Sequence, residues 1–80
     1  MKTNEIKKGM RVKLRNGWYG TMMDNMRGNT RMVEVEGYET EIGSVYSHDI
    51  AMVKVDGVWM MVHLTPAQLK LRISVEAWAA

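Results

Sequence analysis

Basic side chains recur at every second position near the start of the chain. Arg11, Lys13 and Arg15 alternate with apolar residues, so that in an extended strand all three point to one side. Protein surfaces that bind nucleic acid typically place cations, which contact phosphates, next to aromatic rings on which bases stack. The sequence therefore predicts a nucleic-acid surface formed by Lys7, Lys8, Arg11, Lys13, Arg15, Trp18, Tyr19, Arg27 and Arg31.

The charges of the chain are unevenly spread, which leaves other interpretations of the basic residues open. Residues 1–31 hold eight Lys and Arg against two acids, and residues 32–80 hold three against seven. The alternating cations can also simply solvate the outer face of an edge strand and discourage aggregation. An acidic row, Glu34, Glu36, Glu39 and Glu41, either faces the basic strand and neutralises it or lies on the opposite side. In the second case the charge separation suits head-to-tail association or a charged protein partner.

A second group of residues is apolar and lies in the segment 51–62. Trp59 and Met61 share one side of a predicted strand, while Val58, Met60 and Val62 share the other, so both sides are apolar. Core packing explains most large apolar residues. Trp and Met are nevertheless enriched at interfaces. The alternative prediction is thus a protein-interaction or self-associating surface that uses Met52, Trp59 and Met61.

Residues that often carry catalysis are present but poorly arranged. Ser47, His48 and Asp49 have the residue types of a catalytic triad, but immediate neighbours cannot usually form its relay. The chain has two histidines and no cysteine, and its strand carboxylates lack the spacing of a calcium loop. We therefore expect a non-enzymatic protein with no cofactor, no metal and no small-molecule substrate.

Glycine turns divide the chain into short strands. Asn16-Gly17, Gly28-Asn29 and Asp56-Gly57 separate segments of alternating apolar and polar residues, and such pairs favour type I′ hairpin turns. Strands are predicted over residues 10–15, 18–23, 31–36, 39–46, 51–55 and 58–62. These strands must position the basic and the apolar side chains.

The C-terminal segment supports two interpretations. Residues 65–68 are typical of a helix start, with Thr65 as N-cap, Pro66 at the first helical position and Gln68 three residues after the cap. A helix from there can run to Trp78. However, every second residue from Leu69 to Val75 is apolar, which is the periodicity of a strand. We expect a single helical turn over residues 65–68, followed by a strand.

The opening segment KKGMRVKLRNGWYGTM resembles the start of small Src-homology-three-like barrels of the KOW type. Gly9, Val12, Gly17 and Gly20 match the family pattern, while Met10 stands where the family usually has Asp. The closing segment HLTPAQLKLR is similar to the one-turn helix and last strand of such barrels, and GYETEIGSVYSHDI resembles stretches of small bacteriophage and prophage proteins. The resemblance covers residues 7–72.

The resemblance implies a mainly β fold, an all-β barrel of about five to seven antiparallel strands with one short helical turn near the C-terminus. It also implies contacts with RNA or ribosomal partners and a phage origin. With 80 residues, we expect one domain over 1–80 with its core at about 7–75. The lack of cysteine, of a signal peptide and of a run of roughly 20 apolar residues leads us to expect a cytoplasmic protein, in a bacterial host if phage-derived.

Overall fold

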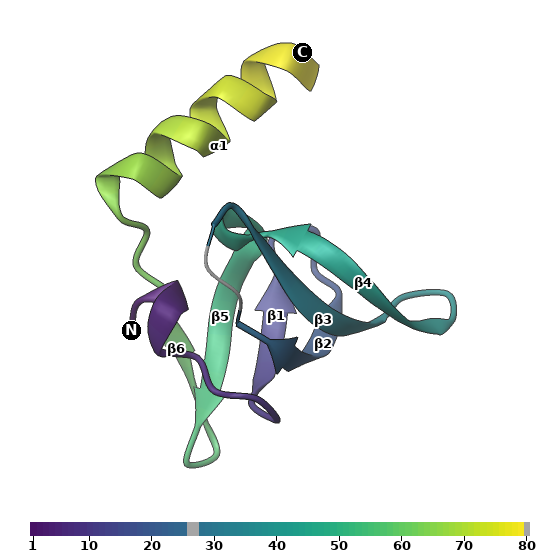
Figure 1. The fold of residues 1–80 in the computed structure, drawn as a ribbon. Helices are drawn as coiled ribbons and strands as arrows, with labels where there is room; N and C mark the ends of the chain where they lie inside the picture. The colour runs from purple at the N-terminus through teal and green to yellow at the C-terminus, as the bar shows by residue number, and fades with distance from the viewer. Residues whose placement is uncertain (26–27, 80) are drawn as a thin grey trace.

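The computed structural model describes residues 1–25 and 28–79, and it is mainly β (Figure 1). Six strands are followed by one C-terminal helix; the 3₁₀ turn η1 precedes the first strand, and the 3₁₀ turn η2 connects the fourth strand to the fifth. The elements are η1 (Thr3–Glu5), β1 (Arg11–Leu14), β2 (Tyr19–Asp24), β3 (Thr30–Glu36), β4 (Thr40–Tyr46), η2 (Ser47–Asp49), β5 (Ile50–Val55), β6 (Val58–Met61) and α1 (Pro66–Ala79). The six predicted strands are confirmed, with their ends shifted by at most one residue.

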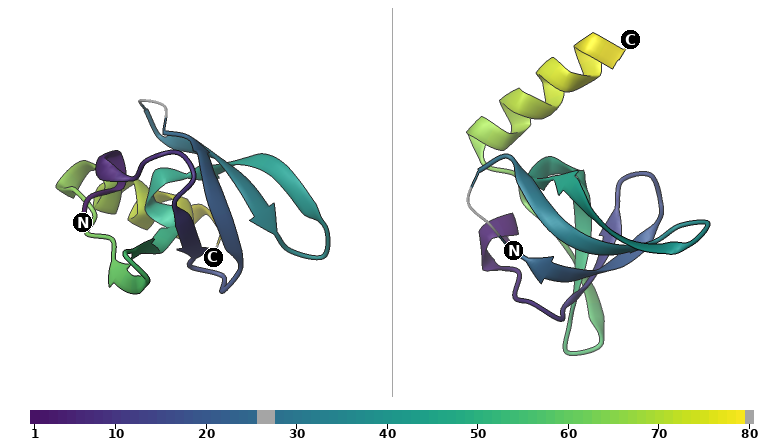
Figure 2. Two further views of the ribbon diagram at one scale, coloured as in Figure 1. Left: turned by 90° about the horizontal axis from the view of Figure 1, so that it is seen from below. Right: turned by 45° about the vertical axis from the view of Figure 1, so that its right-hand side comes forward.

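All six strands form one antiparallel sheet in the order β4-β3-β2-β1-β5-β6. The sheet curves around its core, as the two views in Figure 2 show. It does not close, because in the described part of the chain β4 pairs only with β3 and β6 pairs only with β5. The predicted antiparallel, mainly β architecture is confirmed, and the sheet ends, within the described chain, in two strands, β4 and β6, that do not pair with each other as they would in a closed barrel. The N-terminal amine of Met1 donates to the Met61 carbonyl oxygen at the end of β6.

The core lies on the inner side of the curved sheet. Period-two alternation directs one face of each central strand inward, so that Val12 pairs with Val53 across β1 and β5 with both side chains buried. The buried apolar residues are Ile6, Val12, Leu14, Met22, Val33, Ile50, Val53 and Val62. Gly20 in β2 permits a close approach, since a Cβ there would lie 2.7 Å from Val33 Cγ1 and 2.8 Å from the Glu34 carbonyl oxygen.

The turns of two hairpins differ in type. Asp56 and Gly57 both have positive φ, 50° and 79°, as the predicted type I′ turn requires. At Asn16-Gly17 only Gly17 has positive φ, 93°, so the type I′ prediction there is wrong. Asn16 Oδ1 instead accepts a hydrogen bond from the Trp18 amide at 3.0 Å, and the Leu14 amide donates to the Trp18 carbonyl at 2.7 Å. The result is a three-residue loop over 15–17.

The C-terminal segment is a 14-residue helix, so the prediction of one helical turn followed by a strand is wrong. The Thr65 amide donates to Gln68 Oε1 at 3.0 Å and the Gln68 amide donates to Thr65 Oγ1 at 3.2 Å, which forms a complete capping box. No strand of the described chain lies beside the segment to pair with it, so the capped start decides its conformation. The helix extends away from the sheet and contacts the turn η2 (Figures 1 and 2).

Within residues 1–25 and 28–79, no helix has the length and apolar character needed to cross a bilayer.

Candidate nucleic-acid interface

The outer face of the sheet brings together residues from both predicted surfaces. Lys13 on β1 lies opposite Tyr19 on β2 and opposite Met52 on β5. Met52 in turn lies opposite Met61 on β6. The basic residue Lys13 and the apolar surface predicted from Met52, Trp59 and Met61 are therefore parts of one continuous face. We call it the outer face, and its residues are Lys13, Tyr19, Met52, Lys54, Trp59 and Met61.

An aromatic pair with two cations lies on the outer face. The ring centroids of Tyr19 and Trp59 are 5.6 Å apart, with the rings tilted by 51°. Lys13 Nζ lies 5.5 Å from the Tyr19 centroid, and Lys54 Nζ lies 5.9 Å from the Trp59 centroid. Both distances are within the range of cation–π attraction. Each ring is thus held beside a positive charge.

A groove lined by three cations adjoins the outer face. Lys13, Arg15 and Arg72 line it, and its volume is about 470 Å³. The rest of the wall comes from the β1–β2 turn and from Ala51 and Met52 on β5. We call it the basic groove. It lies between the end of β1 and helix α1, so both the sheet and the helix supply its charges.

Arg15 is held in place and is close to a like charge. Its Nε donates a hydrogen bond to the His48 carbonyl oxygen at 2.6 Å. Burial lowers the pKa of Arg15, the positive charge of Arg72 lowers it further, and Asp49 and Glu76 oppose both effects. Arg72 Nε also donates to Glu76 Oε1 at 2.9 Å on the exposed side of α1. An anion in the groove would relieve the repulsion between the two guanidinium groups.

The guanidinium group of Arg11 forms an ion pair with an acidic residue of strand β3. Its guanidinium forms a two-point ion pair with the Glu36 carboxylate and donates to Thr21 Oγ1 at 3.0 Å. The hydrogen bond from Arg11 lowers the pKa of Glu36, and the same bond raises the pKa of Arg11. The acidic row therefore neutralises the basic strand at this position. Across the described residues, Lys13 and Arg15 make no ion pair.

Arg31 is buried in the fold. It is 3% exposed, and it donates to the carbonyl oxygens of Gly28 and Thr30, both at 2.8 Å, and to Asn4 Oδ1 at 2.6 Å. Burial lowers the pKa of Arg31. Its guanidinium fixes the start of β3 and is not available to a phosphate, so we leave Arg31 out of the interface.

The remaining predicted residues lie apart from the basic groove or outside the described structure. Trp18 packs over Gly37 and meets Tyr38 edge-on, with centroids 5.9 Å apart. Lys7 and Lys8 are exposed in the loop that precedes β1, whereas Arg15 follows its other end. Arg27 lies outside the described residues.

Two cations of the interface were missing from the sequence prediction. Lys54 is two residues after Met52 and therefore on the same side of β5, so strand alternation was the signal that would have identified it. Arg72 lines the groove because residues 66–79 form a helix. The sequence pattern predicted a strand there, and so it did not place Arg72 near Lys13 and Arg15.

Ser47, His48 and Asp49 form the turn η2 and not a catalytic relay. His48 is buried, and its ring stacks on Tyr46 with centroids 5.0 Å apart. Ser47 Oγ and His48 Nδ1 are buried without a hydrogen-bond partner, so the two side chains do not bond to each other. Among the residues that the structure describes, no three His, Cys, Asp or Glu side chains are grouped as metal ligands would be.

Comparison of the chain with protein-family models, with curated proteins and with solved structures gives no match. The outer face and the basic groove are thus the observations from which a function can be inferred.

Proposed function

We propose that the protein is a non-enzymatic binding module that contacts single-stranded nucleic acid. Phosphates lie in the basic groove on Lys13, Arg15 and Arg72, and bases stack on Tyr19 and Trp59. The observation that carries the proposal is the position of three cations in one groove next to an aromatic pair. Phosphate contacts supply most of the affinity of such surfaces, and aromatic stacking adds to it without requiring a particular base.

The aromatic pair favours single strands over duplexes. A base reaches the face of a side-chain ring only when it is unstacked from its neighbours, as in loops and single strands. Tyr19 is 40% exposed, so part of its ring is open to a base. Lys54 beside Trp59 adds a fourth cation at the far side of the outer face. A strand of nucleic acid can therefore run from the groove across the two rings.

The family and origin that the sequence suggested remain part of this proposal. Short antiparallel strands curved around one core support a Src-homology-three-like barrel of the KOW type. That resemblance implies RNA or ribosomal partners. A phage-derived protein acting in the bacterial cytoplasm agrees with this role.

Fluorescence anisotropy tests the proposal. The probes are labelled DNA and RNA single strands of about 12 nucleotides and a DNA duplex of the same sequence. The single strands are expected to bind more tightly than the duplex. Tyr19→Ala and Trp59→Ala are each expected to lose about 1–3 kcal/mol, or roughly 5- to 150-fold in affinity. Tyr38→Ala is the matched control, because Tyr38 is a tyrosine that is 99% exposed on the β3–β4 turn and is not one of the outer-face residues. Equal losses in all three variants would contradict the assignment.

A second function, self-association or binding of a protein, is favoured by a separate observation. Met61 is 66% exposed beside Met52, and Leu69 and Ile73 are exposed one turn apart on α1. Exposed apolar groups of this kind suit an interface. Ile73→Ser separates the two functions, because Ile73 is exposed on α1 and is not part of the outer face: the change is expected to weaken association in analytical ultracentrifugation and to leave nucleic-acid affinity unchanged.

A further inference from the structure

Strand β4 has an open edge whose backbone groups point away from β3. At one end of the β3–β4 ladder, the Ser47 amide donates to the Asn29 carbonyl oxygen at 2.8 Å. At the other end, the Gly37 amide donates to the backbone carbonyl oxygen of Glu39 at 3.2 Å. Facing residues of an antiparallel ladder alternate between hydrogen-bonded and non-hydrogen-bonded pairs. The even-numbered residues of β4, from Thr40 to Tyr46, therefore direct their N–H and C=O groups to the open edge.

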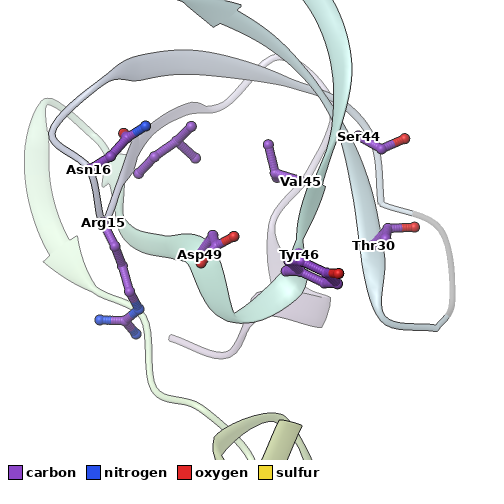
Figure 3. Close-up of a pocket in the computed structure, with 8 residues that line it drawn as sticks. Arg15, Asn16, Thr30, Ser44, Val45, Tyr46 and Asp49 are labelled. Carbon is purple, nitrogen blue, oxygen red and sulfur yellow. The ribbon is translucent and has the colours of Figure 1, made fainter. Parts of the chain in front are cut away.

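A groove runs between this strand and the end of β1. Two adjoining cavities, of about 550 and 250 Å³, share Leu14, Asn16 and Val45 in their linings. Figure 3 shows Val45 on the side of β4 that faces Asn16 and Asp49, whereas Ser44 and Thr30 lie on the other side. We call this space the β4 groove. Its floor is apolar, and its combined size is within the range of ligand-binding pockets, about 300–1,000 Å³.

One end of the β4 groove is acidic. Glu39 and Glu41 line it together with Trp18 and Val35. In the residues that the structure describes, neither carboxylate takes part in an ion pair. A lysine or arginine side chain fits such a place, because its stem packs on apolar groups and an aromatic ring while its charged end meets carboxylates.

The groove has walls on both sides from this chain. β4 forms one wall, and the β1–β2 turn with Asp49 forms the other. A single extended strand can enter such a space. A strand that belongs to a second sheet is less suited to it, because the strand paired with it would have to enter as well. The open backbone groups then supply hydrogen bonds, and the acidic end selects the side chain.

We propose that the β4 groove binds an extended segment of another protein, with a lysine or arginine side chain beside Glu39 and Glu41. The added segment would pair with the even-numbered residues of β4. Nucleic-acid binding is not required for this interaction, since the proposed phosphate contacts lie in the basic groove and the proposed base contacts lie on the outer face.

Anisotropy with labelled peptides tests this inference. The probes are peptides of about six residues, the length of a typical strand, with alternating Thr and Val and a central Lys. A second peptide has Glu in place of Lys, and a third has N-methyl groups on alternate amides along one edge. The Lys peptide is expected to bind at least about tenfold more tightly than the Glu peptide, because like charges repel in the acidic end. The N-methylated peptide, which cannot donate to β4, is expected not to bind.

Variants of the protein supply the second arm. Glu39→Gln with Glu41→Gln is expected to remove the difference between the Lys and Glu peptides. Ser44→Pro removes an amide at the open edge and leaves the β3 ladder intact, so it is expected to abolish binding. Ser44→Val keeps the amide and is the matched control.

Three results would overturn the inference. The first is equal affinity of the native protein for the Lys and Glu peptides, and the second is no binding of the Lys peptide at all. The third is a dimer in analytical ultracentrifugation that Ser44→Pro dissociates, because a second copy of the chain would then cover β4. The N-methylated peptide leaves the protein unchanged and so tests the pairing even if Ser44→Pro fails to fold.

Discussion

The salt dependence of nucleic-acid binding should follow the number of cations in the basic groove. The perturbation is Arg15→Gln together with Arg72→Gln, which removes two of the three groove cations and leaves Lys13. For single strands, the logarithm of the affinity falls with the logarithm of the salt concentration by about 0.7 for each neutralised phosphate. Three contacts give a slope of about −2, and one contact gives about −0.7.

These slopes translate into a large difference over a modest salt range. Between about 50 and 200 mM salt, the native protein is expected to lose affinity roughly 20-fold. The double variant is expected to lose affinity only about threefold over the same range. Titrations of one labelled single strand at four or more salt concentrations measure both slopes. Arg15→Gln also loses the hydrogen bond to the His48 carbonyl, so thermal melting must show that the variant is folded.

A matched variant separates the groove from the net charge. Lys7→Gln with Lys8→Gln removes the same formal charge from the loop at the other end of β1. Its slope is expected to remain at about −2. If the salt slope of this control becomes as shallow as that of the groove variant, binding responds to net charge alone and the assignment of phosphates to the groove is refuted. An unchanged slope in the groove variant would refute it as well.

Further predictions concern the ion pair, the sheet and the helix. Glu36→Gln frees Arg11 and is expected to steepen the salt slope by about 0.7. The pKa of Glu36 is lowered below 4.5, so the stability that the ion pair contributes is present above that pH and is lost as the pH falls. The melting temperature of Glu36→Gln should therefore change less than that of the native protein between about pH 5 and pH 3. Gly20→Ala is expected to cost about 1–3 kcal/mol in the free energy of unfolding, measured by urea denaturation, because its Cβ would crowd Val33. Thr65→Ala removes the capping box and should destabilise α1 by about 0.5–2 kcal/mol, seen as lost helical circular dichroism with unchanged melting of the sheet.

Alternation along the chain identified all six strands, but it also predicted a strand from Leu69 to Val75 where the structure has part of α1. Residues such as Val12 and Leu14 are inward on β1 because a strand directs every second side chain to the same face. The Asp56-Gly57 hairpin was likewise predictable, because two positive φ values in succession suit this pair of residues. These features depend on neighbours in sequence, which a single sequence displays.

The candidate site depends on contacts that no local pattern contains. Tyr19 and Trp59 meet because β1 pairs with both β2 and β5, and the register between β1 and β5 joins distant segments. Arg31 shares its side of β3 with Val33, so alternation alone places it on the inner face, but the Gly28 and Asn4 acceptors that hold its guanidinium come from other parts of the fold. At the C-terminus, strand periodicity and helix capping conflicted, and the lack of a neighbouring strand in the described chain decided between them.

The pairing of β1 with β5 has a consequence for how the protein is made. Strands β1 to β4 form a meander of sequence neighbours, and β5 with β6 form a separate hairpin. Each local hairpin closes a short loop, but Val12 meets Val53 only after the whole meander has been synthesised between them. Contacts between distant residues form slowly during folding, so we expect this pairing to form after the local hairpins. The same pairing brings Met52 beside Lys13 and the β5–β6 hairpin beside β1, so the complete outer face forms only after β5 and β6 have been synthesised.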